Sequence, residues 1–268
     1  MKVKKGIPGL FPLCATAMIL FSLLLISCGS GKKKSQFTPN PAENDPMVHY
    51  QKGVKYLNEG QCARASLEFR TSMKIDDGNS VVHNVYGLAQ FCLGNYDIAI
   101  SSYKKAIDLN PFYTDVHNNL GIAYMEVGSL EEALVEFNRV LTDTHYQTPE
   151  VAYFNKGLVY HKQNQFVKAT NEFRKAVELK PSMTGWRIQL AQTLEKLERY
   201  EEAALECNRA LKFQPNNAKA NFLLCRLLYQ RLNKPQKAKI YCCQTKDLVP
   251  GTKMGSVAED LCLKLSSY

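Results

Sequence analysis

A spacing of 34 residues recurs along most of this 268-residue chain and constrains its fold more than any other feature. Gly53, Gly87 and Gly121 stand 34 residues apart, and an alanine and an aromatic residue follow each of them at fixed intervals. Because self-similarity at this period is the signature of a repeat architecture, we predict six copies of one unit. The other members of the series are Ala65, Ala99 and Ala133; Phe69, Tyr103 and Phe137; after two extra residues Gly157, Ala169 and Phe173; then Ala191, Ala203 and Cys207; and, with one further insertion, Cys225, Ala238 and Cys242.

The residue types in this series predict that each copy is a pair of antiparallel helices. Glycine or alanine at two fixed places would let two helix backbones approach closely, while the aromatic side chain fills the gap to the next copy. Proline follows the second helix of four copies and cannot continue it, because it has no amide donor. The predicted fold class is therefore all-α. The prolines are Pro111, Pro181, Pro215 and Pro250.

The pattern resembles the tetratricopeptide repeat, which has a small residue at its eighth position, alanine at the twentieth, an aromatic at the twenty-fourth, a small residue at the twenty-seventh and proline at the thirty-second. Ala106, Ala176 and Ala210 fill the twenty-seventh position here. The resemblance covers residues 46–251 and implies a superhelical solenoid of about six helix-turn-helix repeats, which stabilise one another. Residues 252–268 predict a short amphipathic helix that caps the last repeat. Its apolar residues are Val257, Leu261, Leu263 and Leu265.

The first 27 residues predict a signal peptide. Three lysines near the start precede an uncharged apolar run at residues 13–26. The run ends in Leu25-Ile26-Ser27-Cys28. This ending resembles the lipobox of bacterial lipoproteins, which implies cleavage before Cys28 and a covalent lipid on its sulfur. An uncleaved membrane helix is the alternative, but the run is shorter than the roughly 20 residues that cross a bilayer.

The residues after Cys28 predict where the protein is held. Gly29 and Ser30 follow the cysteine, without the aspartate that keeps lipoproteins at the inner membrane, so we expect lipid anchoring at the periplasmic face of the outer membrane. Residues 28–45 contain prolines and few apolar residues, as a flexible linker does. Without the three signal lysines, 34 − 3 = 31 basic residues face 25 acidic ones. The one dense basic run lies at residues 32–34 beside the anchor. Binding of nucleic acid would need a basic stripe along the folded part, and an extracytoplasmic protein does not meet nucleic acid, so we expect none as a partner.

Motifs of catalysis do not occur in the sequence. It has no glycine-rich phosphate loop and no paired nucleophile and base, so we predict neither enzyme activity, nor a small-molecule substrate, nor any cofactor beyond the lipid. His49, His83 and His117 occupy the same position in three successive repeats. Because helices pack 8–10 Å apart, these histidines lie too far from one another to share a metal, and we predict no metal site.

The cysteines outside the signal and the anchor number seven, so at least one is unpaired. Cys62 begins the second helix of repeat one and Cys92 ends the first helix of repeat two, which makes a disulfide between them a hypothesis. Cys207 occupies an aromatic position of the repeat and Cys225 a glycine position, so we interpret both as small core residues. We expect no bridge between the neighbours Cys242 and Cys243.

The first helix of each repeat lines the concave face of tetratricopeptide arrays, and the resemblance implies a partner-binding groove there. Asparagine amides could hydrogen-bond the backbone of a bound segment, and apolar neighbours would supply burial. The alternative is that some of the apolar residues pack between helices. The predicted groove residues are Tyr50, Val54, Leu57, Asn84, Leu88, Phe91, Asn118, Asn119, Ile122, Met125, Phe154 and Asn155, with Leu158 and His161 nearby.

The join between repeats three and four contains Tyr146-Gln147-Thr148-Pro149. Together with the lipobox, linker and six repeats, this segment resembles the PilF/PilW/Tgl family of type IV pilus lipoproteins. The resemblance implies an outer-membrane pilotin that binds secretin subunits and promotes their localisation and multimerisation. A periplasmic tetratricopeptide lipoprotein that recruits cell-wall enzymes or envelope-assembly proteins is the alternative. Cys207 and Cys242 at the aromatic position, and Lys52 where leucine is usual, depart from the family pattern.

Overall fold

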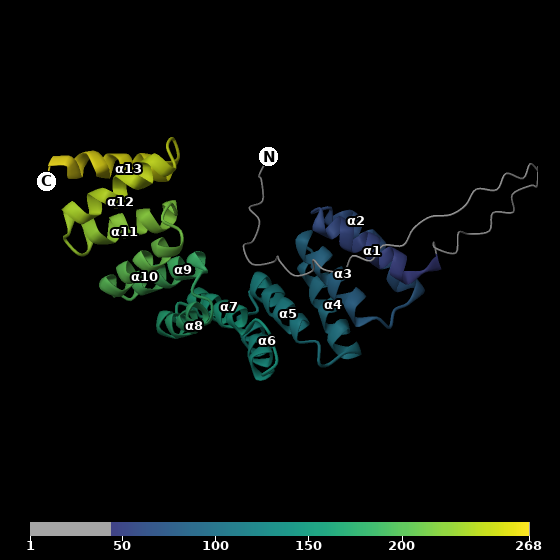
Figure 1. The fold of residues 1–268 in the computed structure, drawn as a ribbon. Coiled ribbons are helices and arrows are strands. Elements are labelled where there is room, and N and C mark those ends of the chain that lie inside the picture. Colours follow the sequence, from purple (N-terminus) through teal and green to yellow (C-terminus); the bar gives the residue numbers. More distant parts are fainter. Residues whose placement is uncertain (1–43, 268) are drawn as a thin grey trace, which may run out of the picture. The chain divides into compact units, whose positions relative to one another are not determined.

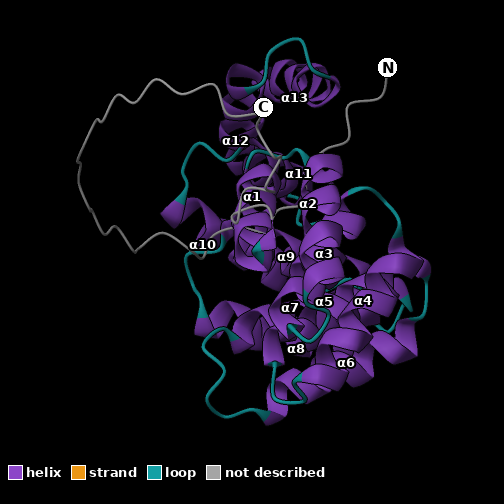
Figure 2. Cartoon of the chain, turned by 90° about the vertical axis from the view of Figure 1, so that its right-hand side faces the viewer, coloured by secondary structure: helices purple, strands orange, loops and turns teal. Residues whose placement is uncertain are grey.

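The computed structural model describes residues 44–267, and the described part is all-helical (Figures 1 and 2). Twelve helices form six pairs, and a thirteenth helix and a 3₁₀ turn follow. The helices are α1 (Pro46–Asn58), α2 (Cys62–Ile75), α3 (Ser80–Cys92), α4 (Tyr96–Leu109), α5 (Thr114–Val127), α6 (Leu130–Thr142), α7 (Pro149–Lys162), α8 (Phe166–Leu179), α9 (Thr184–Lys196), α10 (Tyr200–Phe213), α11 (Ala218–Gln230), α12 (Pro235–Leu248), α13 (Lys253–Lys264) and the turn η2 (Leu265–Ser267).

Each helix packs against the helix before it and the helix after it in the chain. Figure 1 shows the pairs following one another in sequence order from α1 and α2 to α11 and α12, with α13 beside α12. Such a stack of neighbours is the arrangement of a solenoid, in which each repeat contacts mainly the adjacent ones. The predicted all-α repeat fold is confirmed.

The glycine at the eighth position touches the aromatic ring at the twenty-fourth in the first four pairs. A Cβ atom at Gly53 would lie 2.4 Å from the Phe69 ring, and one at Gly121 would lie 2.6 Å from the Phe137 ring. Gly87 and Gly157 meet the corresponding rings in the same way. Since Cβ atoms do not approach carbon this closely, glycine is needed for the two helices to pack around the ring.

The turns between paired helices contain one residue in the left-handed region. Gly60, Gly94 and Gly128 supply it in the first three repeats, with φ of 72°, 79° and 84°. Repeats four to six use Asn164, Glu198 and Asn233 instead, with φ of 59°, 59° and 47°. Asparagine tolerates this conformation, whereas glutamate does so at a cost of about 1 kcal/mol or more.

The C-terminal helix α13 covers α12 mainly with small residues, while Leu265 of the following turn is fully buried and Leu261 packs on the same core, as predicted. Gly255, Ala258 and Cys262 are its buried residues. Val257 and Leu263, which the sequence pattern predicted to face the last repeat, are instead 41% and 66% exposed. The prediction from the spacing of the large apolar residues was wrong for these two. A helix face made of glycine and alanine allows α12 to approach closely, whereas bulkier residues would hold the helices apart.

The predicted signal peptide, Cys28 and most of the linker lie outside the described residues. Within residues 44–267, no helix has the length and apolar character that crossing a membrane requires.

Candidate protein-interaction surface

The first helices α1, α3, α5 and α7 carry the predicted groove residues. Eight of the twelve are partly exposed, namely Tyr50, Val54, Leu57, Leu88, Asn118, Asn119, Ile122 and Phe154. The other four are buried, with exposed fractions of 6–7%, namely Asn84, Phe91, Met125 and Asn155. The surface open to a partner is therefore narrower than the sequence indicated, and binding by its accessible residues stays a prediction.

Hydrogen bonds between asparagines explain part of this burial. Asn119 Nδ2 donates to Asn84 Oδ1 at 3.0 Å, and Asn84 Nδ2 donates to Tyr113 Oη at 3.2 Å. Asn155 Nδ2 donates to Asn118 Oδ1 at 3.0 Å. These bonds join α3 to α5 and α5 to α7, so Asn84 and Asn155 connect successive repeats. A side-chain amide has two donor hydrogens and an acceptor oxygen, so Asn118 Nδ2 keeps its donors for a partner.

The apolar groove residues lie partly in the core and partly at the surface. Tyr50, Val54 and Leu57 pack on the cluster that contains Phe69, and Leu88 packs on the next cluster. Phe154 stacks on Trp186 with ring centroids 4.8 Å apart and planes at 15°. Because these side chains are held in place by the core yet keep exposed area, a bound apolar segment would gain about 25 cal/mol for each Å² that it covers.

Side-chain contacts with glutamate account for two of the three repeated histidines. His49 Nδ1 lies 2.7 Å from Glu68 Oε2, and His117 Nδ1 lies 2.6 Å from Glu136 Oε2. Each pair joins the fourth and the twenty-third position of one repeat. Arg187 and Glu206 make the same contact in repeat five, at 2.8 Å. Each pair connects the two helices of its own repeat.

His83 is the exception, because position twenty-three of its repeat is Ser102 rather than glutamate. Its Nε2 atom instead lies 3.0 Å from the Asp77 carbonyl oxygen and 3.1 Å from the Asp77 carboxylate. Each histidine thus has a partner near its own repeat. Across residues 44–267, histidine, cysteine and acidic side chains form no group of three that could hold a metal ion.

Three disulfides link successive helices. The hypothesised Cys62–Cys92 bridge joins α2 to α3 with Cα atoms 6.1 Å apart, inside the usual range. Cys225 is fully buried in the core, as its core interpretation predicted, and it is bonded to Cys242 with a Cα separation of 5.1 Å, a bridge that was not predicted. The contact between positions eight and twenty-four brings these two sulfurs together. Cys207, at the aromatic position of repeat five, is a buried free cysteine, as its core interpretation predicted.

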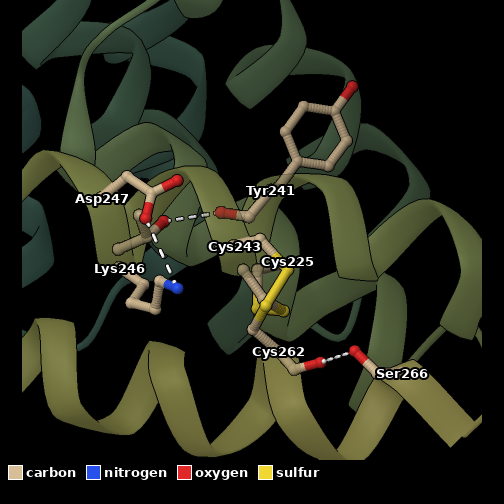
Figure 3. The surroundings of a disulfide bond; sticks show 9 residues. Cys225, Tyr241, Cys243, Lys246, Asp247, Cys262 and Ser266 are labelled. Atoms are coloured by element: carbon tan, nitrogen blue, oxygen red, sulfur yellow. Dashed lines mark hydrogen bonds and ion pairs between the residues drawn. A yellow bond between two sulfur atoms is a disulfide. The ribbon is translucent and has the colours of Figure 1, made fainter.

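The third bridge was not predicted. Cys243 on α12 is bonded to Cys262 on α13, with Cα atoms 5.0 Å apart, as Figure 3 shows. Cys242 and Cys243 thus pair with different helices and form no bond with each other, in line with the expectation for these neighbours. The two bridges fasten α12 to the helix on each side of it.

The join between repeats three and four is fixed to the start of α5. Thr114 Oγ1 donates to Asp143 Oδ2 at 2.6 Å. This hydrogen bond, together with one from the His145 backbone amide, holds the pKa of Asp143 below its usual value. Burial raises the pKa of Tyr146 to about 12. The join, which contains the two residues inserted between repeats three and four, is therefore held by specific contacts rather than forming a loose loop.

Comparisons with known proteins agree with this arrangement. The family model "TPR repeat" matches residues 87–128, and the model "Anaphase-promoting complex, cyclosome, subunit 3" matches residues 126–206. The type IV pilus assembly protein PilF of Pseudomonas aeruginosa is 24% identical over 239 residues, which are 89% of this chain and 94% of PilF. The chain is a tetratricopeptide repeat protein that is similar to PilF along nearly its whole length. The predicted resemblance is confirmed.

The likeness to PilF and PilW runs along nearly the whole of those proteins. The solved PilF structure has a TM-score of 0.68 at 23% identity and aligns with 82% of this chain and 99% of its own. PilW, described as a widely conserved type IV pilus biogenesis factor, has a TM-score of 0.71 at 21% identity, with 80% and 98% covered. BBS4, a BBSome complex member of Bos taurus, is 27% identical over 130 residues. This tetratricopeptide repeat protein spans about a quarter of BBS4, 24% of its length.

Two exposed features of this tetratricopeptide repeat protein were not predicted from its sequence. Phe112 is 92% exposed beside a hollow of about 620 Å³ that includes His117 and Arg139. Phe112 directly follows the repeat proline Pro111. The residues that follow this proline in the other repeats are small or polar, namely Ser182, Asn216 and Gly251, so the aromatic residue could have been noticed in the sequence. The second feature is a set of exposed apolar residues on second helices, such as Leu67 and Ile240 at 62% and 63%.

Proposed function

We propose that this protein is an outer-membrane lipoprotein of type IV pilus biogenesis that acts as a pilotin. In this proposal it binds secretin subunits, brings them to the outer membrane and promotes their multimerisation. The single observation that supports it most is the similarity to PilF over 89% of this chain and 94% of PilF. A shared repeat alone would match short stretches, as it does with BBS4.

The anchoring part of the proposal rests on the lipobox sequence that ends at Cys28. Support for an extracytoplasmic site comes from the cysteines, since six of them are paired in three disulfides within the described residues. Disulfides persist in oxidising compartments such as the periplasm and are rare in a reducing cytosol. A periplasmic protein with a lipid on Cys28 would stand at the membrane where secretins assemble.

In the proposed complex, the secretin segment binds to the first-helix face of repeats one to four. The accessible apolar residues there, such as Leu57, Leu88 and Phe154, would cover the segment's apolar side chains. The free amide hydrogens of Asn118 would pair with its backbone. Lipid anchoring would keep the bound secretin at a high effective concentration beside its insertion site, and this raises the rate of multimer formation without new contacts.

Secretin multimers on a denaturing gel test the proposed function. Deletion of the gene should replace the multimer by monomer, and the wild-type gene should restore it. A Cys28→Ala variant should restore it poorly, with multimers displaced from the outer membrane, because the unanchored protein still binds secretin but does not carry it there. Unchanged multimers in the deletion strain would rule out the pilotin role.

The periplasmic adaptor remains the alternative outcome of this test. Multimers that are normal in the deletion strain, together with cell-wall hydrolases that lose their location in the envelope, would support it. A matched control for partner binding is Leu67→Asp, because Leu67 lies in repeat one but on the second helix, away from the first-helix face.

A further inference from the structure

Residues of α10, of α12 and of the end of α11 line a hollow of about 520 Å³ in repeats five and six, whereas the predicted groove lies on the first helices of repeats one to four. On α10, its wall is Glu201, Ala204, Leu205 and Asn208, which are spaced i, i+3, i+4 and i+7 and so share one helix face. On α12, the opposite wall includes Lys237 and Ile240. At 1.5 Å per residue, the wall on α10 is about 10 Å long, enough for roughly two turns of a bound helix.

The hollow is apolar inside. Leu228 of α11 and Leu232, just beyond that helix, are among its lining residues. Leu205 and Ile240 are 48% and 63% exposed, although both are large aliphatic side chains. They occupy the twenty-second position of repeats five and six, where repeats two and four have the polar residues Ser101 and Asn171 and repeats one and three have the exposed apolar residues Leu67 and Val135.

The neighbouring groove between α8 and α10 is crossed by an ion pair, whereas this hollow is open. Arg174 and Glu202 join α8 to α10 at 2.6 Å. The equivalent positions beside α12 are Asn208 and Lys237, which cannot form such a pair. No salt bridge of the described residues involves Lys234, Lys237 or Glu201, so two lysines on the α12 side remain for an external acid.

The α12 wall of the hollow is fixed in place before anything binds. Cys225–Cys242 bonds α12 to α11, and Cys243–Cys262 bonds it to α13. A partner does not have to order this part of the surface, and such preorganisation increases affinity by lowering the entropy cost of binding.

We propose that this hollow binds a short amphipathic helix of a protein partner, whose leucine or isoleucine stripe enters between α10 and α12 and whose acidic residues face Lys234 and Lys237. A concave apolar floor favours inserted side chains, because a flat lipid surface cannot fill it. The site lies in repeats five and six and is therefore separate from the proposed secretin groove, which lies on the first helices of repeats one to four.

Fluorescence anisotropy with two designed peptides tests this proposal on the mature protein. One peptide is a two- to three-turn helix with a leucine stripe edged by glutamates, and the other has lysines in place of the glutamates. We expect only the acidic peptide to bind. Ile240→Asp and the double change Lys234→Glu with Lys237→Glu should each weaken binding about tenfold or more.

Leu67→Asp is the matched control, because Leu67 has the same repeat position and nearly the same exposure as Ile240. It should leave binding unchanged, and circular dichroism should show that every variant is folded. Equal binding of both peptides, no binding of the acidic peptide up to about 1 mM, or no effect of Ile240→Asp would overturn the proposal. So would loss of binding to phosphatidylglycerol vesicles, or loss of self-association, as the sole effect of these substitutions.

Discussion

The first four repeats and the last two fill the same place between their helices in different ways. In repeats one to four, glycine at position eight lies against an aromatic ring at position twenty-four, as Gly121 does against Phe137. Repeat five has Ala191 with Cys207, and repeat six has Cys225 bonded to Cys242. Where the ring is lost, its partner becomes larger than glycine. The helix pair keeps its packing because the two positions change together, not because either residue is required by itself.

We expect the largest loss of stability when the aromatic ring at position twenty-four is removed. Phe137→Cys should lower the free energy of unfolding by roughly 3 kcal/mol, because the fully buried ring leaves a cavity beside Gly121. Adding Gly121→Ala, which reproduces the pair of repeat five, should recover part of the loss, although Gly121→Ala alone costs about 1–3 kcal/mol by overpacking. Urea denaturation of the wild type, the two single variants and the double variant measures how strongly the two substitutions influence each other. Strictly additive effects would show that positions eight and twenty-four are not coupled.

A second test concerns the disulfide in repeat six. Cys225→Ala turns its pair into the one found in repeat five, so packing is kept while the bond is lost. The bridged residues are 17 apart in sequence, and we expect the change to cost about 3 kcal/mol in oxidised protein. With dithiothreitol in the urea titration, the variant and the wild type should differ by much less. An equally large difference under reducing conditions would show that the cysteine matters through its packing.

The turns between paired helices also differ between early and late repeats. Repeats one to three place glycine in the left-handed region, whereas repeat five places Glu198 there, at φ 59°. Glu198→Gly should therefore stabilise the protein by about 0.5–1 kcal/mol, and Gly94→Ala should destabilise it by about 1 kcal/mol. Chemical denaturation checks both changes. If Glu198→Gly is destabilising, the glutamate makes a contribution that its backbone conformation does not reveal.

The smallest expected effect is a pH dependence where the two regions meet. Burial, and then the charge of Lys196, lower the pKa of His161 from its usual 6.5. The unfolded chain thus takes up a proton at higher pH, so stability is fully present above about pH 6.5 and falls as the pH drops through the folded pKa. Thermal melts between pH 7.5 and 5.5 should show a larger drop for the wild type than for His161→Gln. Parallel curves for both proteins would contradict this assignment.

The sequence predicted the fold because small residues, aromatics and prolines recur in one register. It predicted the Cys62–Cys92 pair because antiparallel neighbours bring helix ends together. The same reasoning could have found Cys225–Cys242, since positions eight and twenty-four touch in four other repeats, but the altered residue types hid that contact. Cys243–Cys262 had no such signal, because α13 belongs to no repeat.

The groove was predicted less completely than the fold. Repeat position indicates which helix face a residue occupies, but it does not reveal a neighbour in the next repeat. Asn84 and Asn155 are buried through hydrogen bonds to residues 29–37 positions away in sequence. Val257 and Leu263 were misplaced for a related reason, since the small residues Gly255 and Ala258 set the packed face of α13.

The central functional claim is that the first-helix face of repeats one to four holds a secretin segment, and one binding measurement tests it most directly. Isothermal titration of the purified periplasmic part of the secretin into the wild type, Leu57→Asp and Leu67→Asp proteins compares two leucines of the same repeat, one on each helix. We expect binding to the wild type and to Leu67→Asp, with a loss of about tenfold or more in Leu57→Asp while its circular dichroism is unchanged. Equal affinities in all three proteins, or no binding by the wild type, would contradict it.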